Sequence, residues 1–334
     1  MTESAITAES QRRLLAALRP LGIDREPCPD DEWQALYDRA IAPPLVQSLA
    51  YGRALAIAEG RAAERHVARR RGEPVALLQW FERPFLGRLR LARLMRGPVW
   101  LTPPGPAEWA EMLELIRARY RWRRGRFLFF LPELEAGAET AGLLEAARFQ
   151  RVATGYASIA LDLAPEAAAL RRGLAGKWRN ALVNAERRGL GIDADNGEAA
   201  LDWLLARYEA LRRARGFAAD SPVMIRQIVD NLPTRADAVL LRAVDGAETG
   251  GEPVAGILLI RHGRAATYLV GWTSAQGRRA SANHLLLWHG LLRLREMGAR
   301  SLDLGGLDVE RAAGVARFKL GLSGRPYRLA GAFI

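Results

Sequence analysis

The chain has 334 residues, of which 49% are hydrophobic and 26% are charged. This balance is typical of globular proteins and excludes a disordered or fibrous chain, and the length favours two domains. The longest apolar runs, such as residues 254–260, are far shorter than the roughly 20 residues that a membrane-spanning helix needs. The first residues lack the basic start and apolar stretch of a secretory signal, so we expect a cytoplasmic protein.

The formal net charge is +12, and it comes almost entirely from arginine. Of the 49 basic residues only Lys177 and Lys319 are lysines, which leaves 47 arginines. Such a surface favours nucleic acid, anionic lipid headgroups or diphosphate-bearing metabolites, because a guanidinium binds phosphate through two parallel hydrogen bonds. The alternative explanation is a coding bias toward arginine. Either way, the rarity of lysine draws attention to the two that are present.

Cysteine and histidine usage argues against a metal or redox centre. Cys28 is the only cysteine, which excludes an internal disulfide and a thiolate cluster. Asp30 and Asp31 lie close to it and would raise the pKa of its thiol, so we expect it to be inert. The chain has four histidines, which are His66, His262, His284 and His289. None stands at a metal-binding spacing from carboxylates, and we expect no metal.

The first half of the chain alternates helical and extended patterns. Helices are expected at residues 8–18, 33–39, 45–59, 106–119 and 135–147. Strands are expected at residues 64–71, 74–80, 89–95, 126–131 and 154–163. Turn residues at 71–73 separate the first two strands, and Pro43 and Pro44 interrupt the helical pattern. This half is therefore a mixed α/β unit.

The second half contains another unit of similar size. Helices are expected at residues 167–188, 199–215, 223–231 and 283–297. Strands are expected at residues 191–194, 238–244, 254–262, 265–272 and 301–304. No low-complexity linker separates the halves, so we predict an α/β (mixed α+β) protein of two packed domains, 1–160 and 161–334, with a shared cleft.

The loop at residues 273–282 leads into a helix and carries Arg278 and Arg279. Free backbone N–H groups and the helix dipole at that position could hold a phosphate together with the two arginines. The alternative is an ordinary solvated loop, capped by Ser281 or Asn283.

Several motifs of the second half, in their order and spacing, resemble the Fem-type aminoacyltransferases. The motifs are residues 268–271, 283–288, 296–298, 303–306 and 314–319, with a basic helix over 176–180 and 187–190. The resemblance extends over about residues 167–333, and in the first half it is limited to residues 44–51 and 96–98. It implies two tandem GNAT-like acyltransferase domains, the first of them degenerate.

The resemblance also implies a reaction. Family members take an amino acid from aminoacyl-tRNA and attach it to an amine of a peptidoglycan precursor, while similar proteins transfer acyl groups from coenzyme A. The partners would be aminoacyl-tRNA and a diphosphate-bearing precursor or another amine, with at most peripheral membrane contact and no bound cofactor. Phe318 and Lys319 match the pair that lines the family's cleft, where the lysine lies near acceptor phosphates or stabilises the developing oxyanion. The alternative is an ordinary surface lysine.

Three further candidate residues lie at the end of the strand predicted at residues 301–304. Gly305 and Gly306 follow the strand that contains Asp303, and adjacent glycines let a backbone approach a ligand closely or simply turn. Asp303 could accept the proton of the acceptor ammonium, or it could cap the following turn.

The remaining candidates would bind substrate. Tyr268 and Trp272 flank the end of the sheet and could line the cleft, although aromatic strand residues are often core. Asn283 begins the family's helical motif. The basic candidates for donor or acceptor phosphates are Lys177, Arg179, Arg213 and Arg215. For His284 and His289 we favour packing or capping roles over catalysis.

One departure separates this chain from enzymes that use coenzyme A. Their loop has the form Q/R-x-x-G-x-G/A, but here Arg279 or Ser281 stands where the first glycine belongs after Gln276 or Arg278. A basic chain without this loop favours a tRNA-borne donor. An acyl-CoA-dependent N-acyltransferase and a non-catalytic module that binds polyanions are the alternatives.

Overall fold

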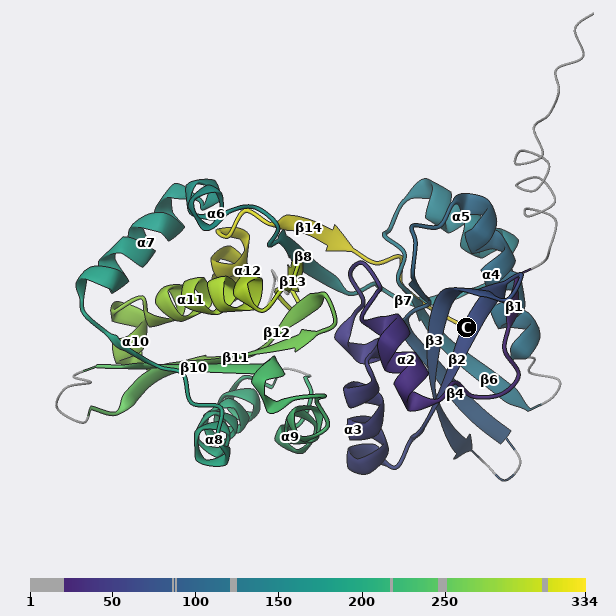
Figure 1. Ribbon diagram of the computed structural model, residues 1–334, viewed down its shortest axis with the longest axis horizontal. Helices are drawn as coiled ribbons and strands as arrows, with labels where there is room; N and C mark the ends of the chain where they lie inside the picture. The colour runs from purple at the N-terminus through teal and green to yellow at the C-terminus, as the bar shows by residue number, and fades with distance from the viewer. Residues whose placement is uncertain are drawn as a thin grey trace, which may run out of the picture.

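The computed structural model describes residues 21–85, 87, 89–120, 125–216, 219–245, 251–307 and 312–334. The helix predicted at residues 8–18 lies outside the described residues. Figure 1 shows two α/β units side by side, with the yellow C-terminal segment running from the second unit back to the first.

The first unit is an eight-stranded sheet of order β1-β2-β3-β4-β6-β15-β7, with β5 paired to β3. Its strands are β1 (Gly22–Ile23), β2 (Ala62–Arg70), β3 (Glu73–Phe85), β4 (Leu89–Gly97), β5 (Val99–Trp100), β6 (Arg126–Pro132), β7 (Arg151–Ala153) and β15 (Ala332–Phe333). Its helices are α2 (Asp30–Tyr37), the 3₁₀ turn η1 (Leu45–Gln47), α3 (Leu49–Glu59), α4 (Pro106–Arg119) and α5 (Ala138–Ala146).

The second unit is a seven-stranded sheet of order β14-β8-β13-β12-β11-β10-β9. Its strands are β8 (Ala157–Asp162), β9 (Gly191–Asp193), β10 (Ala238–Val244), β11 (Pro253–His262), β12 (Ala265–Thr273), β13 (Ser301–Asp303) and β14 (Arg325–Arg328). Its helices are α6 (Ala167–Gly173), α7 (Gly176–Arg187), α8 (Glu198–Arg215), α9 (Pro222–Asp230), η3 (Arg235–Asp237), α10 (Ala275–Arg279), α11 (Ala282–Glu296) and α12 (Ala313–Leu320).

The chain crosses between the two sheets twice. Strand β8 pairs with β13 and β14 in the second sheet, so a boundary after residue 160 falls inside this strand. The last strand, β15, returns to the first sheet and pairs with β6 and β7. The predicted limits 1–160 and 161–334 therefore remain a prediction, and by sheet membership the C-terminal strand belongs with the first unit.

Helices cover both faces of the second sheet. Helices α7 and α11 lie on one face and α8 and α9 on the other (Figure 1). The cluster beneath α8 and α9 continues into the first unit, where Tyr51 and Phe81 are buried with Met224 and Leu258. This continuous apolar cluster packs the two units together as the sequence predicted.

The helices predicted from the local sequence differ from the structure where tertiary contacts interrupt a helix or form one. The helix predicted at 167–188 is broken at Leu174, whose ψ of 138° is extended and whose side chain is buried. The predicted helix at 45–59 begins as a 3₁₀ turn, because Ser48 caps α3 by accepting a hydrogen bond from the Tyr51 amide. The predicted loop at 273–282 contains the short helix α10.

Candidate active site

The parallel strands β12 and β13 separate after a short ladder. They are in register from Ala265 opposite Ser301 to Thr267 opposite Asp303. The chain then turns away, and the Leu304 amide donates to the Ile159 carbonyl of β8 (3.0 Å). Strand β12 runs on to Thr273 with only β11 as its partner among the described strands. The result is an opening between two neighbouring strands at the middle of the sheet.

Lys319 lies beside this opening and is 6% exposed. Its Nζ atom donates to the carbonyls of Gly305 (3.2 Å) and Gly306 (2.7 Å), and it lies 5.8 Å from the ring centroid of Tyr268. Burial lowers the pKa of the Lys319 ammonium to about 8, although the nearby Asp303 carboxylate opposes this effect. The structure thus brings together five residues that the sequence analysis predicted for the site, namely Asp303, Gly305, Gly306, Lys319 and Tyr268.

Of the two glycines, only Gly305 is required by the backbone. Its φ is +73°, and a Cβ atom there would lie 2.8 Å from the Tyr268 carbonyl oxygen. At Gly306 the nearest atom to a Cβ would be 3.8 Å away, which is an ordinary contact. Gly305 therefore lets the chain turn tightly against β12 and present its carbonyl to Lys319.

Asp303 accepts hydrogen bonds on both carboxylate oxygens. Oδ2 accepts from Arg96 (2.9 Å) and the Tyr327 hydroxyl (2.7 Å), and Oδ1 accepts from the Gly305 amide (2.9 Å) and from Ser158. Burial would raise the pKa of this carboxyl, but Arg96 and the hydroxyl hydrogen bonds overcome burial and lower it. These contacts oppose the predicted role of proton acceptor, because a saturated carboxylate of low pKa is a weak base. The alternative reading, an Asp that caps the following turn, matches the geometry.

An aromatic group closes one side of the site. Phe318 on α12 packs edge-on against His284 with centroids 4.9 Å apart, and Trp178 lies 4.9 Å from the same imidazole. Burial lowers the pKa of His284, which agrees with a packing role. Asn283 lies in the first turn of α11, next to His284 in the sequence, and its Oδ1 atom is buried without a hydrogen-bond partner.

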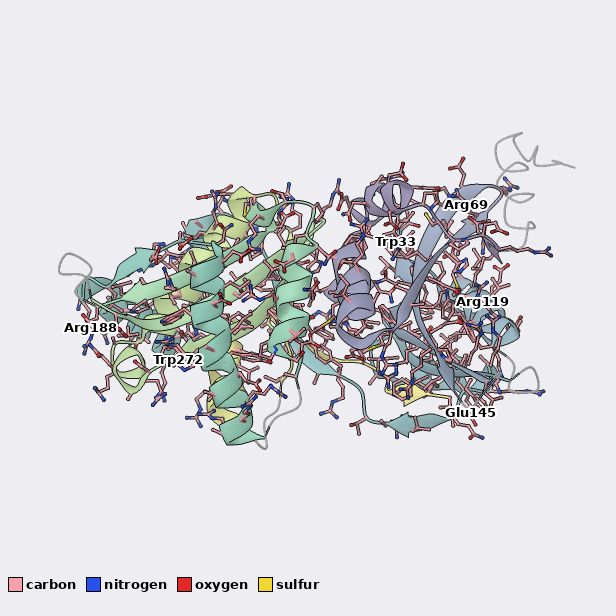
Figure 2. All side chains as sticks on the ribbon, turned by 90° about the horizontal axis from the view of Figure 1, so that it is seen from below. Trp33, Arg69, Arg119, Glu145, Arg188 and Trp272 are labelled. Atoms are coloured by element: carbon pink, nitrogen blue, oxygen red, sulfur yellow. The ribbon has the colours of Figure 1, made fainter. Side chains whose placement is uncertain are left out.

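Tyr268 and Trp272 do not share a cleft. Tyr268 packs into the cluster beneath α7 and α11, whereas Trp272 packs into the cluster beneath α8 and α9. There Trp272, which is labelled in Figure 2, lies edge-on to Trp203 with ring centroids 5.4 Å apart. The ladder of β11 and β12 shifts register between Leu258 and Leu259, which changes the face that following residues occupy. The prediction that both rings line one cleft is therefore wrong for Trp272.

The predicted basic candidates lie on two different helices. Arg213 is at the C-terminal end of α8, strongly exposed and paired with Glu209 (2.6 Å), and Arg215 ends the same helix. This helix covers the face of the sheet opposite α7 (Figure 1). Lys177 and Arg179 lie on the first turn of α7, where Lys177 is exposed. The structure therefore separates the α8 pair from the α7 pair.

Sequence reasoning missed a group of arginines in the first unit, Arg61, Arg83 and Arg93. Burial first, and then repulsion by Arg61 and Arg83, lowers the pKa of Arg93. Arg61 Nη1 and Arg83 Nε are buried without a hydrogen-bond partner, although Arg61 Nε pairs with Glu59 (2.6 Å). Among 47 arginines no local pattern marks these three, since they meet only when β2, β3 and β4 align.

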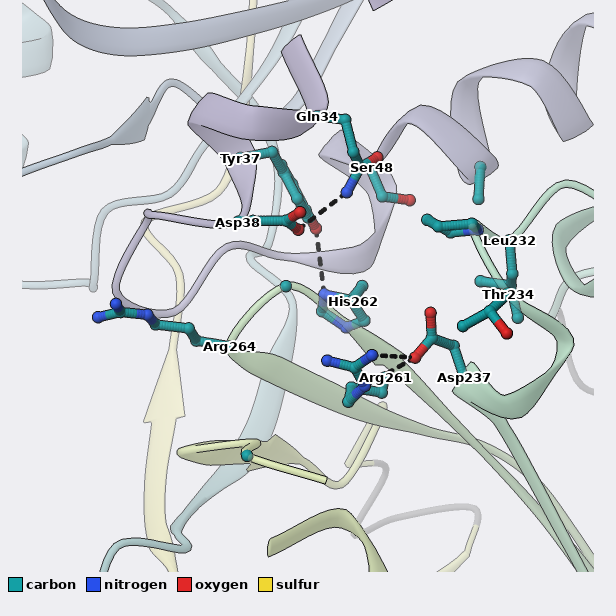
Figure 3. A pocket seen from close by; sticks show the side chains of 14 residues that line it. Gln34, Tyr37, Asp38, Ser48, Leu232, Thr234, Asp237, Arg261, His262 and Arg264 are labelled. Atoms are coloured by element: carbon teal, nitrogen blue, oxygen red, sulfur yellow. Dashed lines mark hydrogen bonds and ion pairs between the residues drawn. The ribbon is translucent and has the colours of Figure 1, made fainter. Parts of the chain in front are cut away.

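A polar cleft of about 340 Å³ lies between the two units (Figure 3). Across it the Tyr37 hydroxyl contacts His262 Nδ1 (3.1 Å), and on the side of the second unit Arg261 pairs with Asp237 (2.7 Å). Burial lowers the pKa of His262 to about 3, so the imidazole is neutral at ordinary pH. His262 therefore links the units through neutral hydrogen bonds.

The predictions of no membrane-spanning helix and no metal site can be compared only with the described residues. In that part of the chain no helix combines the length and the apolar character of a membrane span. No set of three His, Cys, Asp or Glu side chains there is grouped as a metal site. Burial first, and Glu32 second, raises the pKa of the Cys28 thiol to about 11, in the direction that the sequence predicted.

Comparison with known proteins places this geometry in a family. The sequence model of the acetyltransferase (GNAT) domain matches residues 168–320, which contain the opening, Asp303 and Lys319. This part of the chain is similar to GNAT acetyltransferase domains. The match supports an acyltransferase. No curated protein matches the sequence.

Solved structures extend the GNAT fold to both units. FemX is similar at a TM-score of 0.76 and 16% identity, with 92% of this chain and 95% of FemX covered. The L-PGS of Bacillus licheniformis is similar at a TM-score of 0.55 and 12% identity, with 92% of each chain covered. A tandem GNAT protein from the clavulanic acid pathway is similar at 0.52 and 16%, with 94% and 97% covered. The two tandem GNAT-like units and the Fem-type fold predicted from the sequence are confirmed.

Proposed function

We propose that this GNAT protein is an aminoacyltransferase, in which an acceptor amine attacks the ester of aminoacyl-tRNA in the opening between β12 and β13. The observation that carries the proposal is the buried Lys319 ammonium at that opening. The acceptor would be a peptidoglycan precursor or a related peptide amine, and the fold shared with FemX supports this choice.

The proposed step uses Lys319 to stabilise negative charge. The amine nitrogen forms a bond to the ester carbonyl carbon, whose π electrons move to the oxygen, and collapse then breaks the ester C–O bond. The ammonium proton is lost, and the leaving oxygen gains one. An ammonium has three N–H donors, and within the described residues the Gly305 and Gly306 carbonyls take two. The third would bind the oxyanion, and such a donor is worth about 3–4 kcal/mol.

We propose that Phe318 packs beside the acyl group, while Asn283, Lys177 and Arg179 border the donor end of the opening. The positions of these residues at the starts of α7 and α11 and on α12 support this assignment.

For acceptor phosphates we favour Arg61, Arg83 and Arg93 over the predicted Arg213 and Arg215. The first group has buried donor atoms without partners, whereas Arg213 already pairs with Glu209. Arg93→Met should raise KM about 5–10-fold for a phosphate-bearing acceptor and leave KM for the same amine without phosphate unchanged. An equal change for both acceptors would exclude this assignment.

An acyl-CoA donor is the second candidate, favoured by the acetyltransferase description of the matched family. The loop before α11 supports it less. Ser274 caps α10 by accepting from the Gly277 amide (3.0 Å), so this amide is already used, and Ser281 makes no side-chain cap for α11. The loop therefore offers fewer free backbone amides to a pyrophosphate at the position where coenzyme A enzymes have glycines.

The deciding assay offers radiolabelled aminoacyl-tRNAs, or separately labelled acetyl-CoA, with a mixed pool of amine acceptors that includes peptidoglycan precursors. Transfer only from tRNA is the expected result, and transfer only from acetyl-CoA would establish the second candidate. Lys319→Ala should abolish transfer, while Arg293→Met, which removes an exposed cation from α11, should not. Full activity of folded Lys319→Ala would overturn the assigned role. Salt-sensitive binding of nucleic acid without transfer from either donor would instead identify a polyanion-binding module.

A further inference from the structure

Arg96 is an unusual residue of the first unit. It lies near the end of β4, where the parallel ladder with β6 shifts register between Met95 and Gly97. Its φ is +51°, a left-handed conformation that costs a non-glycine residue about 1–2 kcal/mol. A bulge of this kind turns a side chain out of the regular alternation of the strand. The backbone around Arg96 is therefore shaped to redirect one guanidinium.

The guanidinium points to both units at once. Its Nε and Nη2 atoms bind Glu133 of the first unit (2.8 and 2.7 Å), and Nη1 binds Asp303 of the second unit (2.9 Å). Nη2 also donates to the Tyr327 hydroxyl (2.9 Å), and the group lies 4.9 Å from the ring centroid of Tyr156. The side chain is only 13% exposed, so these charged contacts are little screened by solvent.

A short chain of hydrogen bonds connects Arg96 to Lys319. Arg96 and Tyr327 hold one oxygen of Asp303, and the other oxygen accepts the Gly305 amide. The Gly305 and Gly306 carbonyls in turn accept from Lys319 Nζ. The conformation of the turn that binds the Lys319 ammonium is thus tied to the position of the Asp303 carboxylate.

We propose that Arg96 is a positioning residue for the second unit's active site: by fixing Asp303 it orients the Gly305–Gly306 turn and the Lys319 ammonium that rests on it. The first unit is then an active partner in the reaction. This inference rests on the proposed function, since it assigns Arg96 to the same acyl-transfer site.

A purely adhesive ion pair between the units would not need this geometry. Glu133 alone would satisfy two of the guanidinium nitrogens without reaching the second unit. Arg70 provides a comparison, because it pairs with Glu111 (2.6 Å) entirely within the first unit and is also partly buried. Arg70→Met is therefore a matched control that removes one arginine–glutamate pair from the same sheet.

The kinetic test compares Arg96→Met, Arg96→Lys and Arg70→Met as full-length proteins. Arg96→Met should lower kcat about 10–100-fold with KM for the donor changed less than about threefold, because the site is misplaced but still formed. Arg96→Lys should recover part of kcat, since an ammonium can still pair with Asp303. In an Asp303→Asn background, Arg96→Met should cause less than about a twofold further fall. Independent multiplication of the two effects, or equal loss in Arg70→Met, would overturn the proposal.

A second readout does not require activity. Only Lys177 and Lys319 are lysines, so protein labelled with ¹³C-lysine gives two lysine Cε signals, with Lys177 as internal reference. In Arg96→Met, Asp303 keeps its hydrogen bonds from Tyr327, Ser158 and Gly305 and stays ionised but less neutralised. The Lys319 midpoint should then rise by more than about 0.5 pH unit, with no change in Arg70→Met. An unchanged midpoint in folded Arg96→Met would exclude the link, whereas a wild-type protein without transfer activity would overturn only the proposed function.

Discussion

Strands β4 and β6 in the first unit and β12 and β13 in the second are the parallel pairs among the described strands, and a crossover helix lies between the members of each. The first pair is in register from Arg90 opposite Arg126 to Met95 opposite Leu131, and after a bulge at Arg96 it continues to Gly97 opposite Pro132. The second pair ends at Thr267 opposite Asp303. Beyond Thr267 the edge of β12 that faced β13 has no strand partner among the described residues, so its main-chain groups can face a substrate.

Side chains at the strand ends account for this difference. In the first unit Leu94 and Phe130 are fully buried and hold β4 against β6 over the whole ladder. In the second unit the Leu304 amide pairs with β8 instead of β12, and Asp303 anchors the left-handed turn at Gly305 that follows. The closed β4–β6 pair is thus a structural scaffold, and the open β12–β13 pair forms the candidate site.

The largest effect is expected at Lys319. Lys319→Met should lower kcat about 10²–10³-fold, because the oxyanion loses its charged donor. The same change should raise the free energy of unfolding at pH 7 by about 1–3 kcal/mol, because burial depresses the lysine pKa from 10.5 to about 8.

The sign follows from proton binding. The unfolded state holds the Lys319 proton more tightly, so the charged lysine destabilises the fold below pH 8, and wild-type stability rises between about pH 8 and 10.5. Urea denaturation of both proteins across this range measures the effect. A variant that is less stable than wild type would show that the two carbonyl hydrogen bonds outweigh desolvation.

Substitution of Gly305 or Gly306 tests whether transfer depends on the turn beside the opening. Gly305→Ala should lower transfer at least about tenfold and cost about 1–3 kcal/mol of stability, because a Cβ atom collides with the Tyr268 carbonyl in a left-handed turn. Gly306→Ala is the matched control and should retain most activity. Comparable losses in both variants would mean that the turn does not depend on Gly305 alone.

The pH profile should report the protonation of Lys319. If the ammonium stabilises the oxyanion, kcat at saturating acceptor falls about fourfold between pH 6.5 and 8.5 as the group titrates near 8. Any residual activity of Lys319→Arg should lack this fall, because a guanidinium stays protonated throughout. A wild-type profile that rises steadily over this range would contradict the assigned role.

The smallest effect on catalysis is expected in the closed pair. Phe130→Ala removes a fully buried ring and should cost about 3–5 kcal/mol of unfolding free energy. Below its unfolding temperature kcat should stay within about twofold of wild type, because the β4–β6 ladder carries no substrate. Stability from thermal denaturation and kcat from the transfer assay separate the two readouts.

The sequence by itself determined most of the elements and predicted the residues that meet beside the opening. The helix at 106–119 has the predicted bounds, since Pro106 and the capping Glu108 mark its start by local chemistry. The motif at 303–306 and Lys319 were found because they lie in short recognisable runs of sequence. The structural role of such residues depends on neighbours within a few positions of the sequence, so a local pattern can predict it.

Only the tertiary structure decided which residues meet. Arg96 reaches Asp303 across 207 positions, and its bulge has no local signature. A register shift in β11 and β12 moved Trp272 to the opposite face from Tyr268. The hydrogen bonds that Asp303 accepts, among them those from Arg96 and Tyr327, oppose its predicted role as a base. Charge pairing and strand register depend on partners distant in sequence, so the chain must fold before these roles are defined.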